Sequence, residues 1–307
     1  MNKPAYTISD QIALLKQRGM IFRNELQAHD LLKNISYYRL KGYWWDTFDE
    51  TTLNTFQPGT CFEDIMERYD FDRHLRQILF GGIEQIEIAV RTKMIYHLSI
   101  AYGGLWYLNP VLFESNPKIK NGITQTTHLH TLDDLQTEIN RSQEIFIRNH
   151  QQHYPGQPAE AWKILEVASI GTLSKLYKSL KITLPEKGII SKEMGVNSPH
   201  VFSGWLESIA YLRNIIAHHS RLWSRTMMKR PGMQLNKPVG AWFTQPLKQG
   251  QLDKPFSTIS CLLYLFKHLS RSDDLKQQII ELIQSFPNVP IYKLGFFNQW
   301  RSEPLWN

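Results

Sequence analysis

Cysteine is scarce in this 307-residue sequence, where Cys61 and Cys261 stand alone and far apart. The sequence therefore predicts neither a disulfide framework nor a zinc site built on cysteine pairs. Long apolar runs are also absent, since the best one, Ile259–Phe266, is far shorter than the ~20 residues that cross a bilayer. The N-terminus lacks the apolar segment of a signal peptide. We expect a cytoplasmic protein that does not enter a membrane.

Several motifs of common enzyme classes are missing as well. The sequence contains no His-Glu-x-x-His zinc motif, no glycine-rich phosphate-binding loop and no Gly-x-Ser-x-Gly nucleophile elbow. Two histidine pairs have no carboxylate at a fitting helical spacing, and two acidic pairs are typical of a solvated surface: His128/His130, His150/His153, Asp70/Asp72 and Asp133/Asp134. We expect no metal and no cofactor, so any chemistry would be metal-free.

Apolar residues instead recur at three- and four-residue steps, the period of helices. No strand pattern is strong and no repeat is visible, which predicts an all-α fold. We expect an N-terminal helical and aromatic segment over 1–50, a helical core over 60–230, and a loop with further helices over 231–307, packed as one compact unit. Helices are expected at 9–18, with Ser9 as N-cap, and at 26–32, 62–98, 132–153, 161–180, 204–221, 258–269 and 273–286, with an irregular stretch at 192–194 and a loop or hairpin at 231–246.

The longest of these patterns, 62–98, has a clear core stripe. Gly81 and Gly82 within it indicate a kink or a close helix contact. Glu87 and Arg91 have the i, i+4 spacing of a supporting ion pair. The apolar stripe consists of Ile65, Tyr69, Leu75, Ile78, Leu79, Ile83, Ile86 and Val90.

An aromatic cluster occupies residues 34–48, where tyrosines and tryptophans alternate with Arg39 and Lys41. Such clusters usually pack between helices. The same residue types can also form a platform on which nucleic-acid bases stack. Packing is the favoured interpretation, and the second one stays open.

The segment 204–221 divides into two faces when it is wound as a helix. An apolar stripe on one side belongs to the core, and a polar face lies opposite: the stripe is Trp205, Ile209, Leu212 and Ile216, and the polar face is Glu207, Asn214, His218 and Arg221. Arg213 lies on the flank, with Ala210 and Ala217 along the edge, whereas His219 falls toward the core side and is expected to be structural. This polar face is the candidate site.

Arg213, Asn214 and His218 have the chemistry to cleave a phosphodiester bond in RNA. Asn214 and His218 are four residues apart and share a face, so the amide can orient the imidazole or a phosphate oxygen. Histidine can exchange a proton near neutral pH, and arginine presents a planar fork of donors to a phosphate. Because one histidine performs one proton transfer per step, a second is needed. A two-fold dimer through the Arg213/His218 face would supply it, with Ala210 and Ala217 allowing the helices to approach.

The positive charge of the chain is concentrated beside this segment. Between residues 204 and 254, eight basic residues face only two acidic ones, Glu207 and Asp253, which leaves +6 of the total net charge of +7. A basic patch favours a phosphate-bearing partner, although a solvated surface explains it equally well. The eight basic residues are Arg213, Arg221, Arg225, Lys229, Arg230, Lys237, Lys248 and Lys254.

The spacing alone is not specific. Arg148, Asn149 and His153 repeat the Arg-Asn-x-x-x-His pattern, but in a glutamine-rich stretch without an apolar stripe behind it. Looser Arg–His spacings also occur at Arg23/His29, Arg68/His74 and Arg91/His97. We therefore favour the copy at Arg213.

Longer stretches resemble the Abi-like bacterial family of abortive-infection proteins, of the AbiD/AbiF type. They are YLRNIIAHHSRLWSR (211–225), ISYYRLKGYWW (35–45), IEIAVRTKMIYHLS (86–99) and WKILEVASIGTLSKLYKSL (162–180), and they follow in order across most of the chain. The tail departs from the family at Phe297, where proline is expected.

In that family the Arg-Asn-x-x-x-His segment resembles the HEPN ribonuclease motif, which is related to that of the RNA-guided type VI CRISPR nucleases. The resemblance implies a HEPN-like helical bundle with additional N- and C-terminal helices, toxicity in phage defence, and metal-independent RNA cleavage. It assigns the motif positions to Arg213, Asn214 and His218. His219, Ser220 and Arg221 match the segment that follows the motif. Together with the basic residues Arg225, Lys229 and Arg230, they are expected to have weaker RNA-binding roles.

Two other classes of function remain open. A non-catalytic RNA-binding protein would use the basic 204–254 surface to hold RNA, including a small regulatory RNA. An interaction module would use the polar face to dock a partner protein. RNA is the expected partner under the favoured interpretation, as substrate and as regulator. Whether the site is complete in one chain or forms at a dimer interface stays open.

Overall fold

The computed structural model describes residues 5–49, 54–115, 117–120, 123–269 and 274–307. Helices dominate this part of the chain, and its only strands form a short hairpin of β1 (Pro117–Lys120) and β2 (Ile123–Thr126). The predicted all-α fold is therefore confirmed. None of the helices described is long and apolar enough to cross a membrane.

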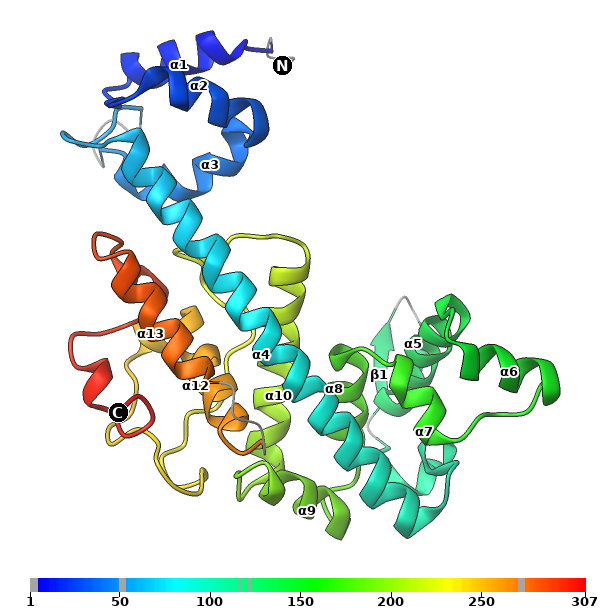
Figure 1. The fold of residues 1–307 in the computed structure, drawn as a ribbon. Helices are drawn as coiled ribbons and strands as arrows, with labels where there is room; N and C mark the ends of the chain where they lie inside the picture. The colour runs from blue at the N-terminus through cyan, green and yellow to red at the C-terminus, as the bar shows by residue number, and fades with distance from the viewer. Residues whose placement is uncertain (1–4, 50–53, 116, 121–122, 270–273) are drawn as a thin grey trace.

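A single long helix, α4 (Phe62–Tyr102), runs through the whole molecule (Figure 1). Its 41 residues span about 60 Å at roughly 1.5 Å per residue. An added Cβ on Gly82 would lie 2.8 Å from Leu275, so this glycine allows a close helix contact. The expected apolar stripe is buried except at two half-buried positions, Tyr69 and Ile78.

Three helices pack at the N-terminal end of α4: α1 (Ile8–Gln17), α2 (Glu25–Asn34) and α3 (Tyr37–Trp44), which continues as the 3-10 helix η1 (Trp45–Thr47). The N-cap of α1 is Thr7 rather than the expected Ser9, because Thr7 and Asp10 form a capping box.

The aromatic cluster of α3 serves mainly as packing. Tyr43 and Trp44 are buried, as the favoured interpretation requires. Tyr38 and Trp45 are exposed, and the ammonium group of Lys41 lies 5.7 and 5.1 Å from their ring centroids. One side of α3 therefore still presents aromatic rings and a cation to solvent.

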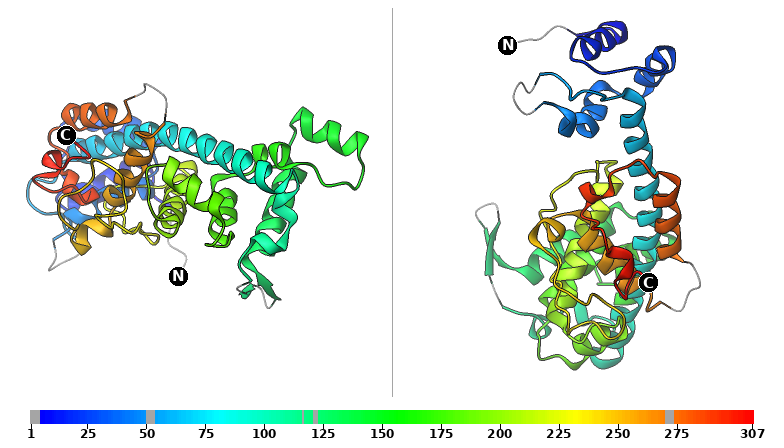
Figure 2. Two further views of the ribbon diagram at one scale, coloured as in Figure 1. Left: turned by 90° about the horizontal axis from the view of Figure 1, so that it is seen from below. Right: turned by 90° about the vertical axis from the view of Figure 1, so that its left-hand side faces the viewer.

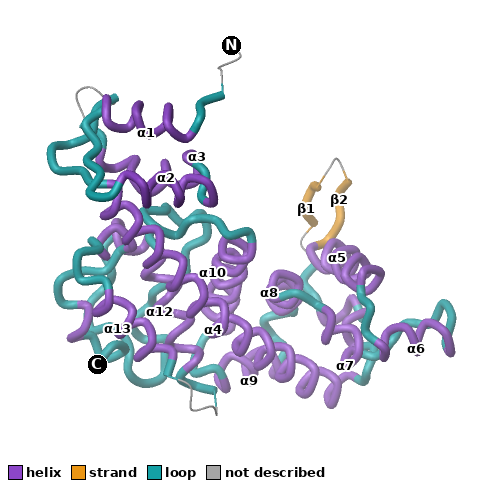
Figure 3. The backbone as a smooth tube through the Cα atoms, turned by 45° about the horizontal axis from the view of Figure 1, so that its top comes forward, coloured by secondary structure: helices purple, strands orange, loops and turns teal. Residues whose placement is uncertain are grey.

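Beside the middle of α4 run α8 (Ile170–Ser179), α10 (Pro199–Ala217) and α12 (Pro255–Phe266), with α10 packed against the other three helices (Figures 1 and 3). A further helix, α9 (Pro185–Glu193), joins α8 to α10. The prediction of an irregular stretch at 192–194 was wrong for Lys192 and Glu193, because α9 begins at Pro185 and reaches Glu193, and only Met194 lies in a turn. Its buried side includes polar Lys187 and Ser191, so its apolar pattern is weak.

A lobe to one side of the molecule contains α5 (Thr127–Arg141), α6 (Ile145–His153) and α7 (Ala161–Ile164) (Figure 2). The single helix expected at 132–153 is thus two helices. The helix expected at 161–180 is also divided, since η4 (Leu165–Val167) separates α7 from α8. The 3-10 helices η2 (Trp106–Leu108) and η3 (Pro110–Leu112) lead from α4 to the hairpin.

The C-terminal region packs back onto α4 and α10. It contains α11 (Gln249–Leu252), α12, α13 (Leu275–Ser285), η5 (Ile291–Leu294) and η6 (Trp300–Ser302). Most of the aromatic tail is buried, although Tyr292 is exposed, and the rings of Phe256 and Trp306 stack 5.7 Å apart. Residues 231–246 form a loop without a hairpin, and Asp273, where we expected the last helix to begin, lies outside the described residues. The proposed division into three segments stays a prediction.

Candidate functional site

The site is built on α10, whose start and core side are well defined by the sequence. The Ser198 side chain accepts a hydrogen bond from the backbone N–H of Val201, and Pro199 follows at the first helical position. All four residues of the predicted stripe are at most 6% exposed. The indole N–H of Trp205 also donates to the Gly232 carbonyl at 2.7 Å. α10 is therefore held firmly from the core side.

The chain turns sharply where α10 ends. His218 is the C-cap, and its backbone N–H donates to the Asn214 carbonyl at 3.1 Å. His219 has φ of 53°, in the left-handed region that residues other than glycine seldom adopt. The guanidinium groups of Arg39 and Arg76 donate to its carbonyl oxygen at 2.7 and 2.8 Å. These two bonds from α3 and α4 fix the turn.

The turn corrects two of our expectations. The helix ends at Ala217, so His219 and Arg221 no longer follow the helical wheel. The side chain of His219 is exposed rather than directed to the core. Arg221 is half-buried, donates to the Trp223 carbonyl and lies against Gly42, so it does not belong to the polar face of α10.

Asp72 in α4 anchors the segment after the turn. Its fully buried carboxylate accepts hydrogen bonds from the backbone N–H groups of Leu222 and Trp223, the latter at 2.7 Å. The Tyr43 hydroxyl donates to it at 2.7 Å, and the guanidinium of Arg76 lies 3.4 Å away. Burial raises the pKa of Asp72, while these donors act in the opposite direction. Sequence reasoning missed this anchor, since Asp72 looked like half of a solvated acidic pair.

The three predicted motif residues lie close together in the chain at the C-terminal end of α10. Asn214 and His218 are exposed and one helical turn apart, and Arg213 is half-exposed beside them. The Arg213 guanidinium lies 3.5 Å from the side-chain oxygen of Asn214. Nearby, Glu87 and Arg91 form the expected ion pair at 2.9 Å. Burial raises the pKa of Glu87, and the charges of Arg91 and Arg213 oppose that rise, which places Arg213 within electrostatic reach of the pair.

Most of the predicted weaker RNA-binding residues have partners within the chain. Lys229 pairs with Glu207 at 2.5 Å, and Arg230 pairs with Asp253 at 2.6 Å. The guanidinium of Arg225 donates to the Arg221 carbonyl at 2.6 Å. Ser220 is half-buried, and its backbone N–H donates to the Ile215 carbonyl at 2.9 Å. Two of these cations are therefore neutralised by carboxylates, and the guanidinium of Arg225 is hydrogen-bonded within the chain.

A groove of about 540 Å³ runs along the polar face of α10, between α10, α8 and α5. Asn214 lies on its α10 wall, and His130 lies on its α5 wall. Nε2 of His130 is buried and has no hydrogen-bond partner among the described residues. The sequence had offered His130 only as half of a weak metal-binding pair, so this position was missed. Ala210 also lines the groove and is 7% exposed, so little of it remains for contact with a second copy.

A second cavity, of about 740 Å³, lies on the other side of the α10 terminus, between α3 and α4. Three arginines line it, Arg39, Arg73 and Arg76, together with the exposed side chain of His219. We call it the arginine pocket. No sequence signal identified it, because its residues come from segments more than a hundred positions apart.

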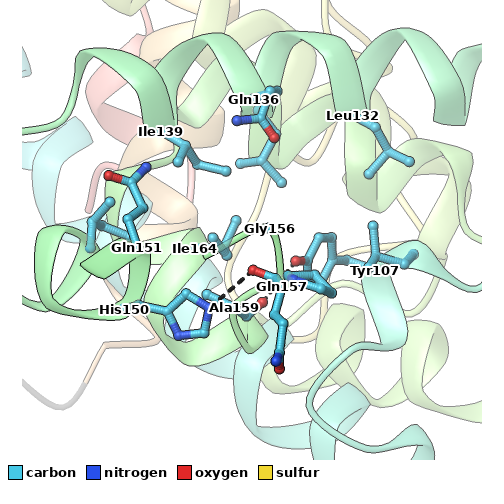
Figure 4. A pocket seen from close by; sticks show the side chains of 14 residues that line it. Tyr107, Leu132, Gln136, Ile139, His150, Gln151, Gly156, Gln157, Ala159 and Ile164 are labelled. Atoms are coloured by element: carbon cyan, nitrogen blue, oxygen red, sulfur yellow. Dashed lines mark hydrogen bonds between the residues drawn. The ribbon is translucent and has the colours of Figure 1, made fainter. Parts of the chain in front are cut away.

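The second copy of the pattern has a different environment. Arg148 and His153 are exposed on α6, a helix in which Ile147 is the buried residue. Nδ1 of His153 donates to the Asn149 carbonyl at 2.8 Å, so this ring nitrogen is already hydrogen-bonded within its own helix. The neighbouring cavity of about 380 Å³ has a mixed polar and apolar lining, and neither Arg148 nor His153 lines it (Figure 4). In this cavity His150 instead contacts the Gln157 carbonyl.

The described residues contain no group of three or more histidine, cysteine, aspartate or glutamate side chains suited to hold a metal ion. Cys61 and Cys261 are buried and unpaired. The site therefore offers an amide, an imidazole and a guanidinium as its chemical groups.

Comparison with known proteins identifies a family. The sequence model of a family described as Abi-like protein matches residues 30–224, which run from the second half of α2 through α10 and the turn after it. No curated protein and no solved structure matches the chain. The matched region covers more than half of the sequence and contains both the candidate site and the arginine pocket. The chain therefore belongs to the Abi-like protein family.

Proposed function

We propose that this protein is an endoribonuclease of phage defence that cuts RNA at the end of α10 without a metal ion. Membership of the Abi-like family indicates a role in abortive infection. One observation carries the catalytic assignment. Exposed Asn214 and His218 lie one turn apart on a helix whose opposite face is fully buried, with the Arg213 guanidinium 3.5 Å from the Asn214 amide.

The proposed reaction is attack of a ribose 2′-oxygen on the adjacent phosphorus. The O2′–P bond forms as the P–O5′ bond breaks, which leaves a 2′,3′-cyclic phosphate and a 5′-hydroxyl. His218 removes the proton from the 2′-hydroxyl or donates one to the leaving oxygen. Arg213 stabilises the charge that develops on the phosphate, and Asn214 orients the reacting groups.

The second proton transfer needs another group. We propose a two-fold dimer through the Arg213/His218 face, in which the second copy contributes its own His218. Ala210 is nearly buried, so this contact would rest on the exposed residues at the end of α10. His130 is the alternative within one chain, because it lies across the groove from Asn214. Loss of activity in His130→Ala, with a monomeric wild type, would favour the alternative.

The first test incubates purified protein with mixed RNA in EDTA and analyses the fragment ends. We expect cyclic-phosphate ends from the wild type, a loss of at least about 100-fold in rate for His218→Ala, and intact single-stranded DNA. His153→Ala is the matched control and should retain the wild-type rate. Equal cleavage by His218→Ala, or cleavage that requires a divalent metal, would contradict the proposal. Circular dichroism should show that both variants fold.

A second candidate function is RNA binding without cleavage, including capture of a small regulatory RNA. The arginine pocket favours it, since cationic side chains near aromatic rings suit RNA whether or not the strand is cut. Salt-sensitive RNA affinity that persists in His218→Ala, together with no cleavage by the wild type, would select this function over the first.

A further inference from the structure

The arginine pocket is formed by one face of α4 together with α3 and the end of α10. Tyr69, Arg73, Arg76, Gln77 and Phe80 follow one another at helical spacing along α4 and line it. Phe80 lies eleven positions after Tyr69, so at roughly 1.5 Å per residue the row is about 16 Å long. That length exceeds what one small anion needs.

The pocket is rich in hydrogen-bond donors for an anion. Each guanidinium has five N–H groups, and the described contacts use only a few of them. Arg39 donates to the His219 carbonyl at 2.7 Å, and Arg73 lies 3.4 Å from Asp70 and 3.1 Å from His74. No carboxylate is among the residues that line the pocket.

The pocket also has aromatic surface. The Phe80 side chain lines the pocket and is 43% exposed. The guanidinium of Arg39 lies 5.8 Å from the centroid of the Tyr69 ring. Exposed aromatic rings interleaved with arginines are the combination that binds single-stranded nucleic acid, because the rings stack on bases while the guanidiniums hold phosphates.

The position of the pocket connects it to the candidate site. Ile216, Ala217 and His219 line the pocket, and His218 lies between them in the chain at the end of α10. The arginine pocket therefore begins at the residues on either side of His218 in the chain.

We propose that the arginine pocket binds a neighbouring nucleotide of the RNA strand, with Arg39 and Arg73 on the phosphate and Phe80 against the base. The placement beside the cut rests on the proposed function, whereas the binding itself does not. The pocket thus determines where the strand lies and which bases flank the reacting phosphate.

Arg73 is the best residue for a test. Arg39 and Arg76 also hold the His219 carbonyl, so their removal would disturb the turn as well as the pocket. Arg148 on α6 is the matched control, since it is an exposed arginine at the far end of the molecule (Figure 1). Both changes are made in full-length His218→Ala protein, so that the RNA stays intact.

The experiment measures fluorescence anisotropy of a labelled single-stranded RNA over a range of salt concentrations. We expect Arg73→Ala to weaken binding by about 3- to 10-fold and to reduce the salt slope by about 0.7, the value for one phosphate contact on a single strand. Phe80→Ala should weaken binding by about fivefold or more without changing that slope. Arg148→Ala should change neither quantity.

Affinity and slope at the parent level in Arg73→Ala would overturn the proposal, as would the absence of RNA binding at low salt. Adenosine monophosphate and inorganic phosphate serve as competing probes. If their binding requires Arg73 while RNA binding does not, the pocket takes a free nucleotide or phosphate and the proposal fails. Cleavage is scored separately, so RNA binding that depends on Arg73 in a protein that cannot cut would uphold this inference and reject the nuclease.

Discussion

The pattern Arg-Asn-x-x-x-His occurs at the ends of both α10 and α6, but the two copies have different structural surroundings. Behind Arg213–His218 lie a fully buried stripe, a left-handed turn and two arginines that fix it. Behind Arg148–His153 lies one buried isoleucine, and the last histidine bonds to its own helix. The difference shows that the same short pattern can stand in two distinct structural environments.

Removing the anchor of the α10 terminus should have the largest effect. Asp72→Ala leaves Arg76 buried without its carboxylate and frees the N–H groups of Leu222 and Trp223. We expect a loss of about 3–5 kcal/mol in unfolding free energy, measured by urea denaturation. His153→Ala at the end of α6 should cost less than about 0.5 kcal/mol. Similar losses in the two variants would remove the contrast.

The arginines of the two copies should differ in catalysis. Arg213→Ala is expected to lower the rate of RNA cleavage by about 100- to 1,000-fold, because a donor to the developing charge is lost. Arg148→Ala should stay within about twofold of the wild type in the same gel assay, because a solvated side chain remote from the site is removed. A comparable loss in Arg148→Ala would show that the α6 copy contributes to the site.

The support behind α10 should respond to pH through Lys187. This buried lysine of α9 donates to the carbonyls of Lys178 and Leu180, at the end of α8, and burial lowers its pKa to about 8. Below pH 8 the folded and unfolded states both bind the proton. Between about pH 8 and 10.5 the unfolded state binds more protons, so stability rises with pH.

The measurement compares the wild type with Lys187→Met, which removes this titration. The difference in unfolding free energy should shift in favour of the wild type by roughly 2–3 kcal/mol between pH 7.5 and 10.5. Other groups titrate equally in both proteins and cancel. A constant difference over this range would show that Lys187 is not held in the expected environment.

The helix starts offer the smallest test. Ser198→Ala removes the side chain that caps α10 and should cost about 1 kcal/mol in thermal or urea unfolding. Glu144 occupies the same position in α6 without making a capping hydrogen bond, so Glu144→Ala should stay within about 0.5 kcal/mol of the wild type. Equal costs would mean that the two helices begin with comparable support.

Local sequence determined much of this fold and part of the site. Periodicity alone located α4, the buried stripe of α10 and the Glu87–Arg91 pair. It failed at α9, whose buried side includes Lys187 and Ser191, and it joined α5 to α6. The left-handed turn at His219 was also missed, since it depends on arginines 180 and 143 residues away. Contacts across such distances leave no pattern in a local window.

The hydrogen bonds from Arg39 and Arg76 to the His219 carbonyl can form only late during synthesis of the chain. A growing chain presents α3 and most of α4 long before the ribosome has made the residues that they hold. His219 lies 143 positions after Arg76, and all of these residues must first be translated. A protein truncated anywhere before this turn therefore lacks the closed arrangement of Arg39, Arg76 and the His219 carbonyl.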